Sequence, residues 1–176
     1  MAIVSNNISI VIIGYNSQNE LSQCLDSLNK IKFNKSLNEI IYIDDGSNDN
    51  SDNVFKNSPL PCKKIFHKFS KNKGRVFATQ KGLELASSNW ILFLQSNVVV
   101  NSNIINEYLK AINQYSAFAY MGKIFYKSSD RRFEKYSAIV TPVYTLASRA
   151  ATGMFDVFAI ITVLFINGLP VFGSIK

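Results

Sequence analysis

The sequence predicts an α/β fold, a three-layer α/β/α sandwich around a mostly parallel sheet. Three short runs, residues 8–13, 40–43 and 90–94, are rich in β-branched and aromatic residues and lack the polar alternation of a half-exposed strand. Segments with helical periodicity separate these runs, and strands that alternate with helices favour parallel pairing. All three runs should therefore lie in one sheet.

The first predicted strand, residues 8–13, ends in a turn that could contact a ligand. Gly14 lets the backbone turn, and Tyr15 and Asn16 follow it. A tyrosine ring above the edge of a sheet offers a surface on which a nucleotide base could stack. The turn is therefore a candidate nucleotide contact.

Four helices are predicted. The first covers residues 18–30, where apolar residues recur at helical spacing and Ser17 and Glu20 have the spacing of a capping box. The others cover residues 51–56, residues 75–86 and a segment that Ser102 should cap. The buried stripe expected on the last helix consists of Ile104, Ile105, Tyr108, Leu109 and Ile112.

An acidic turn follows the predicted strand over residues 40–43. Asp44 and Asp45 come directly before Gly46, Ser47 and Asn48, which tolerate unusual backbone angles. Open α/β sheets bind ligands at the carboxyl ends of their strands. An acidic turn at such a place can also be a solvated loop. The pattern alone leaves both interpretations open.

The densest basic segment follows a predicted strand over residues 64–67. A run of this kind is either solvated surface or a site for phosphate or nucleic acid. His67 has no metal-ligand spacing to another Cys, His or carboxylate, so it should be structural or on the surface. The basic residues are Lys63, Lys64, Lys68, Lys71, Lys73 and Arg75.

The composition limits the number of domains and the kinds of partner. The chain has 176 residues and a net charge of +7, which fits one core and an affinity for anions such as nucleotides, nucleic acid or an anionic membrane. Cys24 and Cys62 follow no disulfide pattern and should be free thiols. The amino terminus has no basic region and only a short apolar run, so a cytoplasmic protein is expected.

The last third of the chain differs in composition. One or two strands are expected over residues 118–126, followed by a charged connection over residues 127–135. Residues 157–171 are nearly all apolar but fall short of the roughly 20 residues of a membrane-spanning helix. They predict a buried or interfacial helix that packs against another subunit or peripherally on the inner face of a membrane.

Four stretches, taken in order and spacing, resemble the inverting family 2 glycosyltransferases, whose nucleotide-sugar-binding half has the GT-A fold. They are residues 8–16, 39–51, 72–86 and 90–97, and the resemblance covers roughly residues 8–125. It implies a nucleotide-sugar-binding domain over residues 1–126. Residues 127–176 would then be a shortened acceptor-side segment with an apolar tail.

The resemblance implies a transferase that moves a sugar from a nucleoside diphosphate donor to a glycan or lipid-linked acceptor with inversion, as in the biosynthesis of cell-wall or surface glycans. The turns after the first two strands would hold the nucleoside, and the later segments would hold the diphosphate. The residues implied to bind the nucleotide sugar are Tyr15, Asn16, Asp44, Asp45, Asn72, Gly74, Arg75, Gln95 and Asn97.

The sequence departs from the family at three points. Thr79 stands where many members have an arginine. The sequence Gln95-Ser96-Asn97 occupies the place of the Asp-x-Asp motif that binds Mg²⁺ or Mn²⁺, and neutral amides are poor ligands for these hard cations. Asn97 stands at the degenerate motif and no metal ligand is assigned, so a metal cofactor is doubtful here. Cationic side chains such as Lys73 or Arg75 would then have to neutralise the diphosphate, or activity would be low or absent. Finally, no motif marks the catalytic base, for which the candidates are Asp130, Glu134 and above all Asp156.

Two other functions stay open. The loss of the Asp-x-Asp carboxylates favours a degenerate relative that binds a nucleotide or a protein partner without turnover. A nucleic-acid-binding module ranks last, because the basic residues are not interleaved with aromatic ones, and no nucleic-acid partner is expected.

Overall fold

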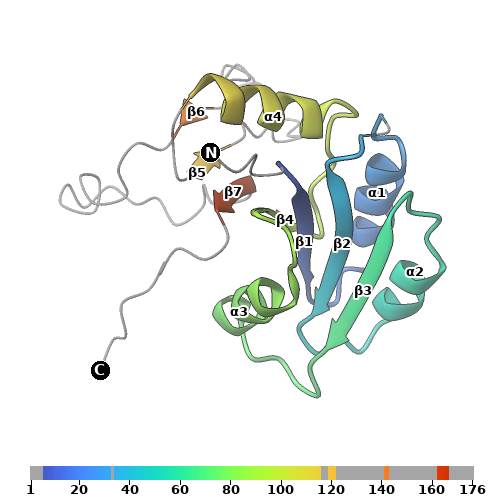
Figure 1. Cartoon of the computed structure of the whole chain (residues 1–176). Helices are drawn as coiled ribbons and strands as arrows, with labels where there is room; N and C mark the ends of the chain where they lie inside the picture. Colours follow the sequence, from blue (N-terminus) through green and yellow to red (C-terminus); the bar gives the residue numbers. More distant parts are fainter. Residues whose placement is uncertain (1–5, 33, 116–118, 122–140, 143–161, 167–176) are drawn as a thin grey trace, which may run out of the picture.

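The computed structural model describes residues 6–32, 34–115, 119–121, 141–142 and 162–166. Within these residues the strands form one seven-stranded sheet in the order β3-β2-β1-β4-β7-β5-β6 (Figure 1). The strands are β1 Ile8–Gly14, β2 Leu37–Asp44, β3 Lys63–Lys68, β4 Trp90–Gln95, β5 Ala119–Met121, β6 Thr141–Pro142 and β7 Thr162–Ile166. The helices are α1 Gln18–Asn29, α2 Ser51–Asn57, α3 Arg75–Leu85 and α4 Ile104–Gln114.

Strands β3, β2, β1 and β4 pair in parallel, whereas β4, β7, β5 and β6 pair antiparallel. The prediction that residues 8–13, 40–43 and 90–94 share one sheet is confirmed. β2 begins earlier than predicted. Leu37 and Glu39 already pair with Ile8 and Ser9 of β1, although the polar Asn38 lies between them in sequence.

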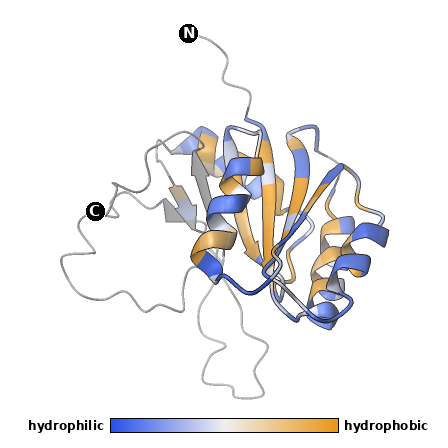
Figure 2. Cartoon of the chain, turned by 90° about the horizontal axis from the view of Figure 1, so that it is seen from below, coloured by the Kyte–Doolittle hydropathy of each residue, from blue (hydrophilic) through white to orange (hydrophobic). Residues whose placement is uncertain are grey.

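Helices cover both faces of the parallel half of the sheet (Figure 1). On one face Ile8, Ile10 and Ile12 of β1 pack with buried residues of α1, α2 and α4. On the other face Val11 packs with Ala78 of α3. Successive side chains of a strand point to opposite faces, so a strand covered on both sides is apolar at almost every position. Figure 2 shows these hydrophobic strands between helices whose outer surfaces are mostly hydrophilic, with the exposed Val76 and Phe77 of α3 as exceptions. The predicted three-layer sandwich is confirmed.

A glycine lets α3 approach the sheet closely. A Cβ atom added at Gly82 would collide with Cγ1 of Val11 in the middle of the sheet. A helix packed this tightly has no room for even a methyl group at that position.

A buried carboxylate fixes the connection between α3 and β4. Glu39 is fully buried, and its Oε1 accepts hydrogen bonds from Ser9 Oγ (2.8 Å), Ser87 N (2.7 Å) and Ser87 Oγ (2.8 Å). Lys63 Nζ lies 3.7 Å from Oε2. Burial raises the pKa of Glu39, but the hydrogen bonds from Ser87 and Ser9 and the charge of Lys63 outweigh it and lower the pKa overall. The carboxylate therefore stays charged inside the fold.

The predicted helix over residues 157–171 is wrong where the structure describes this segment. Residues 162–166 form β7, which pairs antiparallel with β4 of the same sheet, so this part joins the chain's own sheet. Contact of the apolar run with another subunit or a membrane stays a prediction. A short run of Thr, Val, Leu, Phe and Ile suits a strand, and an apolar run without alternation carries no period by which to tell the two structures apart. The rest of the run lies outside the described residues.

Two predicted helix caps are also wrong. Neither Ser17 nor the residue before α4 makes a side-chain cap. The turn before α4 is held by Asn101, whose Oδ1 accepts a hydrogen bond from Asn103 N at 2.9 Å, and Ser102 has no capping role.

Other expectations hold: Cys24 and Cys62 are free, and Ile105 and Tyr108 are buried on α4. Of the strands expected over residues 118–126, β5 is the part described. No helix in the described ranges is long and apolar enough to cross a bilayer.

Candidate functional site

The carboxyl ends of the parallel strands meet at one edge of the sheet. The register places Gly14 beside Asp44 and Ile13 beside Gln95, so the turns after β1, β2 and β4 are neighbours. Figure 2 looks toward this edge. Parallel α/β sheets bind ligands here because the turns leave the strands in diverging directions.

Hydrogen bonds join the turn after β1 to the turn after β2. Asp45 N donates to Gly14 O (2.9 Å), Asn16 N donates to Ser47 Oγ (2.9 Å), and Asn48 N donates to Asn16 Oδ1 (2.8 Å). Asn16 has a φ of 47°, a left-handed conformation that asparagine tolerates better than most residues. The turn is therefore fixed, while the side chain of Tyr15 stays 46% exposed.

Asp44 lies beneath this pair of turns. It is fully buried, and its Oδ1 accepts a hydrogen bond from Ser47 N at 2.8 Å. Its Oδ2 lies 3.6 Å from Lys68 Nζ, at the end of the neighbouring strand β3. A buried carboxylate needs such partners, because an unpaired charge in the interior is costly. Asp44 thus shapes the acidic turn from within.

Asp45 connects the acidic turn to the start of α3. Its Oδ1 accepts a hydrogen bond from Lys73 N (2.7 Å), and its Oδ2 accepts one from Gly74 N (2.9 Å). The close approach of these loops depends on Gly46, which has a φ of 82° and where an added Cβ would lie 2.5 Å from the carbonyl carbon of Lys71. The nucleoside and diphosphate sides of the predicted site are therefore joined through one carboxylate.

The amino end of α3 presents positive charge at this edge. Arg75 is the first residue of the helix, and the first N–H groups of an α-helix have no carbonyl partner within it. Lys71, Lys73 and Arg75 are exposed, and Lys73 Nζ lies 4.7 Å above the ring of Phe69. Exposed N–H groups beside cationic side chains form an anion-binding surface.

The end of β4 offers uncharged oxygen and nitrogen atoms. Ser96 is buried and its N donates to Ile13 O at 2.9 Å, whereas Asn97 is exposed and Gln95 partly exposed. A Cβ at Gly14 would lie 3.0 Å from Cβ of Ser96, so this turn packs against the first one. No cluster of three His, Cys, Asp or Glu residues suited to a metal occurs in the described part of the chain. Amide ligands alone do not fit a dehydrated divalent cation.

The structure brings most of the predicted site residues to one edge, from Tyr15 after β1 to Asn97 after β4. Asp156, Asp130 and Glu134 lie outside the described residues. The sequence analysis assigned no role in the site to the side chains of Ser47 and Asp49. They accept hydrogen bonds from Asn16 N and Gln18 N and so join the turn after β2 to the turn after β1. Serine and aspartate soon after a turn glycine are a signal for such side-chain to backbone bonds.

Part of the basic segment is structural. Lys64 Nζ donates to the carbonyl oxygens of Lys56 (2.6 Å) and Ser58 (2.8 Å) at the end of α2. His67 packs edge-on against Phe69 with ring centroids 4.9 Å apart, and burial together with nearby lysines lowers its pKa. It is therefore neutral near pH 7 and packs on an aromatic ring, and a structural or surface role stays the prediction for it.

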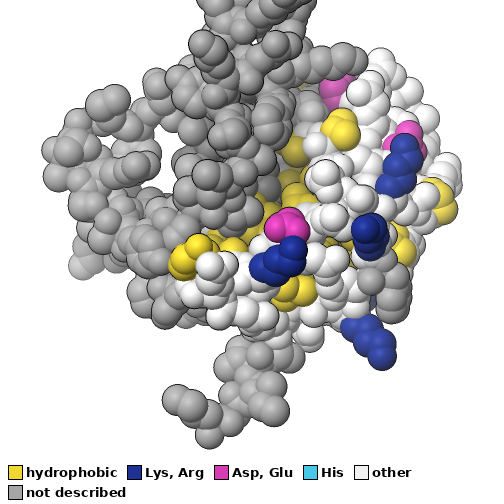
Figure 3. Space-filling view, turned by 90° about the horizontal axis from the view of Figure 1, so that it is seen from above, with side chains coloured by type: hydrophobic (Ala, Val, Ile, Leu, Met, Phe, Trp, Pro, Cys, Tyr) yellow, Lys and Arg dark blue, Asp and Glu magenta, His cyan; other side chains and the backbone are white. Residues whose placement is uncertain are grey.

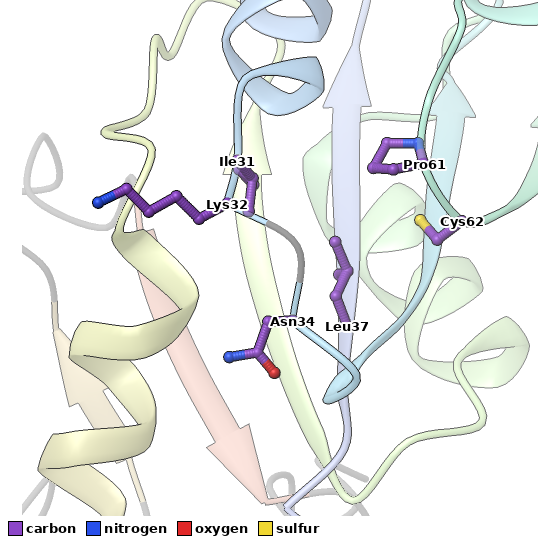
Figure 4. A pocket seen from close by; sticks show the side chains of 6 residues that line it. All are labelled: Ile31, Lys32, Asn34, Leu37, Pro61 and Cys62. Carbon is purple, nitrogen blue, oxygen red and sulfur yellow. The ribbon is translucent and has the colours of Figure 1, made fainter.

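The opposite end of the sheet carries fewer groups suited to binding or catalysis. A small pocket there is lined by Ile31, Lys32, Asn34, Leu37, Pro61 and Cys62 (Figure 4). Burial raises the pKa of the Cys62 thiol to about 11, so it is not a nucleophile at neutral pH. On the face shown in Figure 3, Lys and Arg side chains lie apart from one another, some of them beside an Asp or Glu side chain, and form no continuous basic patch.

Known proteins share this fold. Among solved structures, TarS 1–349 from S. aureus in complex with UDP-GlcNAc has a TM-score of 0.60 and 21% identity, covering 64% of this chain and 33% of that one. Glucosyl-3-phosphoglycerate synthase from Mycobacterium tuberculosis in complex with Mn²⁺, UDP and glucosyl-3-phosphoglycerate has a TM-score of 0.56 and 15% identity, covering 69% of this chain and 44% of that one. Both likenesses show the GT-A fold.

The sequence comparisons identify the family. Glycosyltransferase GlyA from Streptococcus pneumoniae serotype 4 is 28% identical over 123 residues, which are 70% of this chain and 17% of the relative. The chain thus spans less than half the length of these relatives. The model of glycosyl transferase family 2 matches residues 9–163. With this match over most of its length, the chain belongs to glycosyl transferase family 2.

Proposed function

We propose that this chain binds a nucleoside diphosphate sugar and that the protein transfers the sugar, with inversion, to a glycan or lipid-linked acceptor. The observation that carries the proposal is the single edge at which Tyr15, the Asp44–Asp45 turn and the amino end of α3 meet through hydrogen bonds. An aromatic ring, carboxylate oxygens and a cationic helix end match the three parts of such a donor.

Each part of the donor has a complementary group. The half-exposed ring of Tyr15 can stack with the base. Asp45 keeps lone pairs beyond those used by Lys73 N and Gly74 N, and they can accept hydrogen bonds from the base or ribose. The diphosphate would lie beside the cationic side chains of Lys73 and Arg75 at the amino end of α3, where their charges offset repulsion from the Asp45 carboxylate that accepts from Gly74 N.

The transfer itself is a direct displacement. A base takes the proton of the acceptor hydroxyl, and the acceptor oxygen forms a bond to the anomeric carbon. The bond from that carbon to the diphosphate oxygen breaks, and its electron pair leaves with the nucleoside diphosphate. We assign Asp156 as the base on sequence grounds alone.

Charge on the leaving diphosphate must be neutralised for this step to be fast. The family resemblance implies a divalent metal at the end of β4, and the synthase from M. tuberculosis was solved with Mn²⁺. The side chains of Gln95 and Asn97 do not fit that role. We therefore assign the neutralisation to Lys73, Arg75 and the helix end.

A second candidate function is nucleotide binding without turnover. The same amides favour it, because a relative that no longer catalyses transfer has no need of a metal site. The two functions differ in a single measurement, the release of free nucleoside diphosphate from the donor in the presence of acceptors.

Calorimetric titration of the full chain with a panel of nucleoside diphosphates tests the proposal. Replacing Tyr15 with alanine should weaken binding of the tightest ligand by about 1–3 kcal/mol, the usual value of one stacked base. The matched control is Tyr115→Ala, because Tyr115 is 38% exposed at the end of α4 and away from the edge. No binding by the wild type, or equal losses in both variants, would contradict the proposal.

A further inference from the structure

We propose that Asp49 is a positioning residue for the nucleotide site. Its carboxylate joins the amino ends of α1 and α2 and thereby fixes the turn that presents Tyr15. This inference rests on the proposed function, because positioning matters only if the turn holds a nucleoside.

One carboxylate accepts hydrogen bonds from both helices. Gln18 N, at the first residue of α1, donates to Asp49 Oδ2 at 2.9 Å. Ser51, at the first residue of α2, donates to Asp49 Oδ1 through its N (3.1 Å) and its Oγ (2.6 Å). Asp49 thus serves two helix starts that lie more than thirty residues apart in sequence.

Asp49 takes over the capping that α1 lacks locally. Ser17 occupies the N-cap position of α1 but makes no side-chain hydrogen bond to the helix. Unsatisfied N–H groups at a helix start cost stability, and an acceptor from another segment can supply the missing bond. Since α1 begins directly after the Tyr15 turn, the position of its first residue sets the geometry of that turn.

The site favours the ionised form of Asp49. Burial raises the pKa of the carboxyl, but hydrogen bonds from Ser51 and Gln18 outweigh burial and lower the pKa overall. The partial positive charges of two helix starts act in the same direction. The group is therefore a charged acceptor, and hydrogen bonds to charged groups are stronger than neutral ones.

Further bonds run between the same two turns. Asn50 N donates to Gln18 Oε1 at 3.2 Å, and Asn48 N donates to Asn16 Oδ1 at 2.8 Å. In the opposite direction, Asn16 N donates to Ser47 Oγ at 2.9 Å. Tyr15 lies between Asn16 and Gly14, whose carbonyl oxygen accepts from Asp45 N. Both sequence neighbours of Tyr15 are thus hydrogen-bonded to the turn after β2. Asp49 lies at the end of this hydrogen-bond network that is next to the helix starts.

The test measures nucleotide affinity in a double-mutant cycle on the full chain. Asp49→Ala should weaken binding of the tightest nucleoside diphosphate about five- to tenfold but leave binding of inorganic diphosphate unchanged, since that probe does not contact Tyr15. In the Tyr15→Ala background the same substitution should have little further effect, because its route of action has been removed. The matched control is Asp52→Ala, which removes an acid from the first turn of α2 whose carboxylate forms an ion pair with Lys56 of the same helix.

Circular dichroism and thermal melting show whether each variant is folded. Should Asp49→Ala fail to fold, Ser51→Ala removes one donor from the same carboxylate and should give a smaller loss with the same dependence on Tyr15. An unchanged nucleotide affinity in folded Asp49 or Ser51 variants, or equal losses with and without Tyr15, would overturn the inference alone. A wild-type protein that binds no nucleoside diphosphate would overturn the proposed function as well.

Discussion

Replacing Asp45 with alanine should weaken both the fold and the nucleotide site. The substitution removes the acceptors of two hydrogen bonds, from Lys73 N and Gly74 N. Each bond to a charged acceptor contributes about 1.5–3 kcal/mol. Because Lys73 is exposed, water can replace part of the loss, and we expect a decrease of about 2–4 kcal/mol in the free energy of unfolding.

The same substitution should cost about 1–3 kcal/mol in nucleoside diphosphate affinity, through the lost acceptor and through the loosened turn before Arg75. Chemical denaturation measures the first effect and calorimetry the second. Asp45→Asn keeps one acceptor oxygen and should show about half of each loss. Asp26→Asn is the matched control, since Asp26 is an exposed acid on α1.

The outcome that refutes this reasoning is specific. If the Asp45 variants lose stability but keep full nucleotide affinity, the carboxylate is only a link between loops. If Asp44 variants also keep full affinity, the acidic turn does not bind the nucleoside.

Further predictions concern the metal, acid stability and packing. Nucleotide binding by the wild type should not change when Mn²⁺ is added, whereas the double variant Gln95→Asp, Asn97→Asp should bind the nucleotide in a metal-dependent way. Calorimetry with and without a chelator measures both effects, and a steep rise of wild-type affinity with Mn²⁺ would contradict the prediction. The pKa of Glu39 is lowered in the fold, so its stabilising effect is complete above about pH 4.3, the ordinary pKa of glutamate, and is lost as the pH falls through the lower folded value. Glu39→Gln should flatten the acid limb of a stability–pH profile, and an unchanged limb would count against the role of Glu39. Gly82→Ala should lower the melting temperature by an amount equivalent to about 1–3 kcal/mol, because the new methyl group meets Val11; an unaltered melting curve would show that the helix can shift freely.

The sequence predicts the parallel half of the fold because local pattern and final environment agree there. Residues 8–13 and 90–94 are covered on both faces and are accordingly apolar at every position except Ser9, whose hydroxyl donates to the buried Glu39. The site turns are predictable for a related reason, since polar residues directly after such strands must lie at the carboxyl edge. The structure excludes a freely solvated loop at Asp44 and Asp45, because both residues are buried and their carboxylates are bonded within the fold, whereas ligand binding at this turn stays a prediction.

What sequence could not provide are contacts between distant residues. The capping of α1 by Asp49 replaces a local bond that the spacing of Ser17 and Glu20 suggested. The strand at residues 162–166 depends on the open edge of β4, and no pattern within an apolar segment reveals that partner.

The pairing of β4 with β7 has a consequence for the order in which the chain folds. Leu92 pairs with Leu164, so a long loop must close before these strands can meet, and loop closure costs entropy. β1, β2, β3 and β4 are all synthesised before residue 162, so their contacts can form first, although the pairing of β1 with β4, such as Ile10 with Leu92, spans a longer stretch of sequence. On the ribosome, β4 is then an open strand edge until residues 162–166 have been synthesised. A chain cut at residue 126 would keep that edge permanently, and open edges pair with other molecules. Such a fragment should aggregate even though its parallel strands are complete.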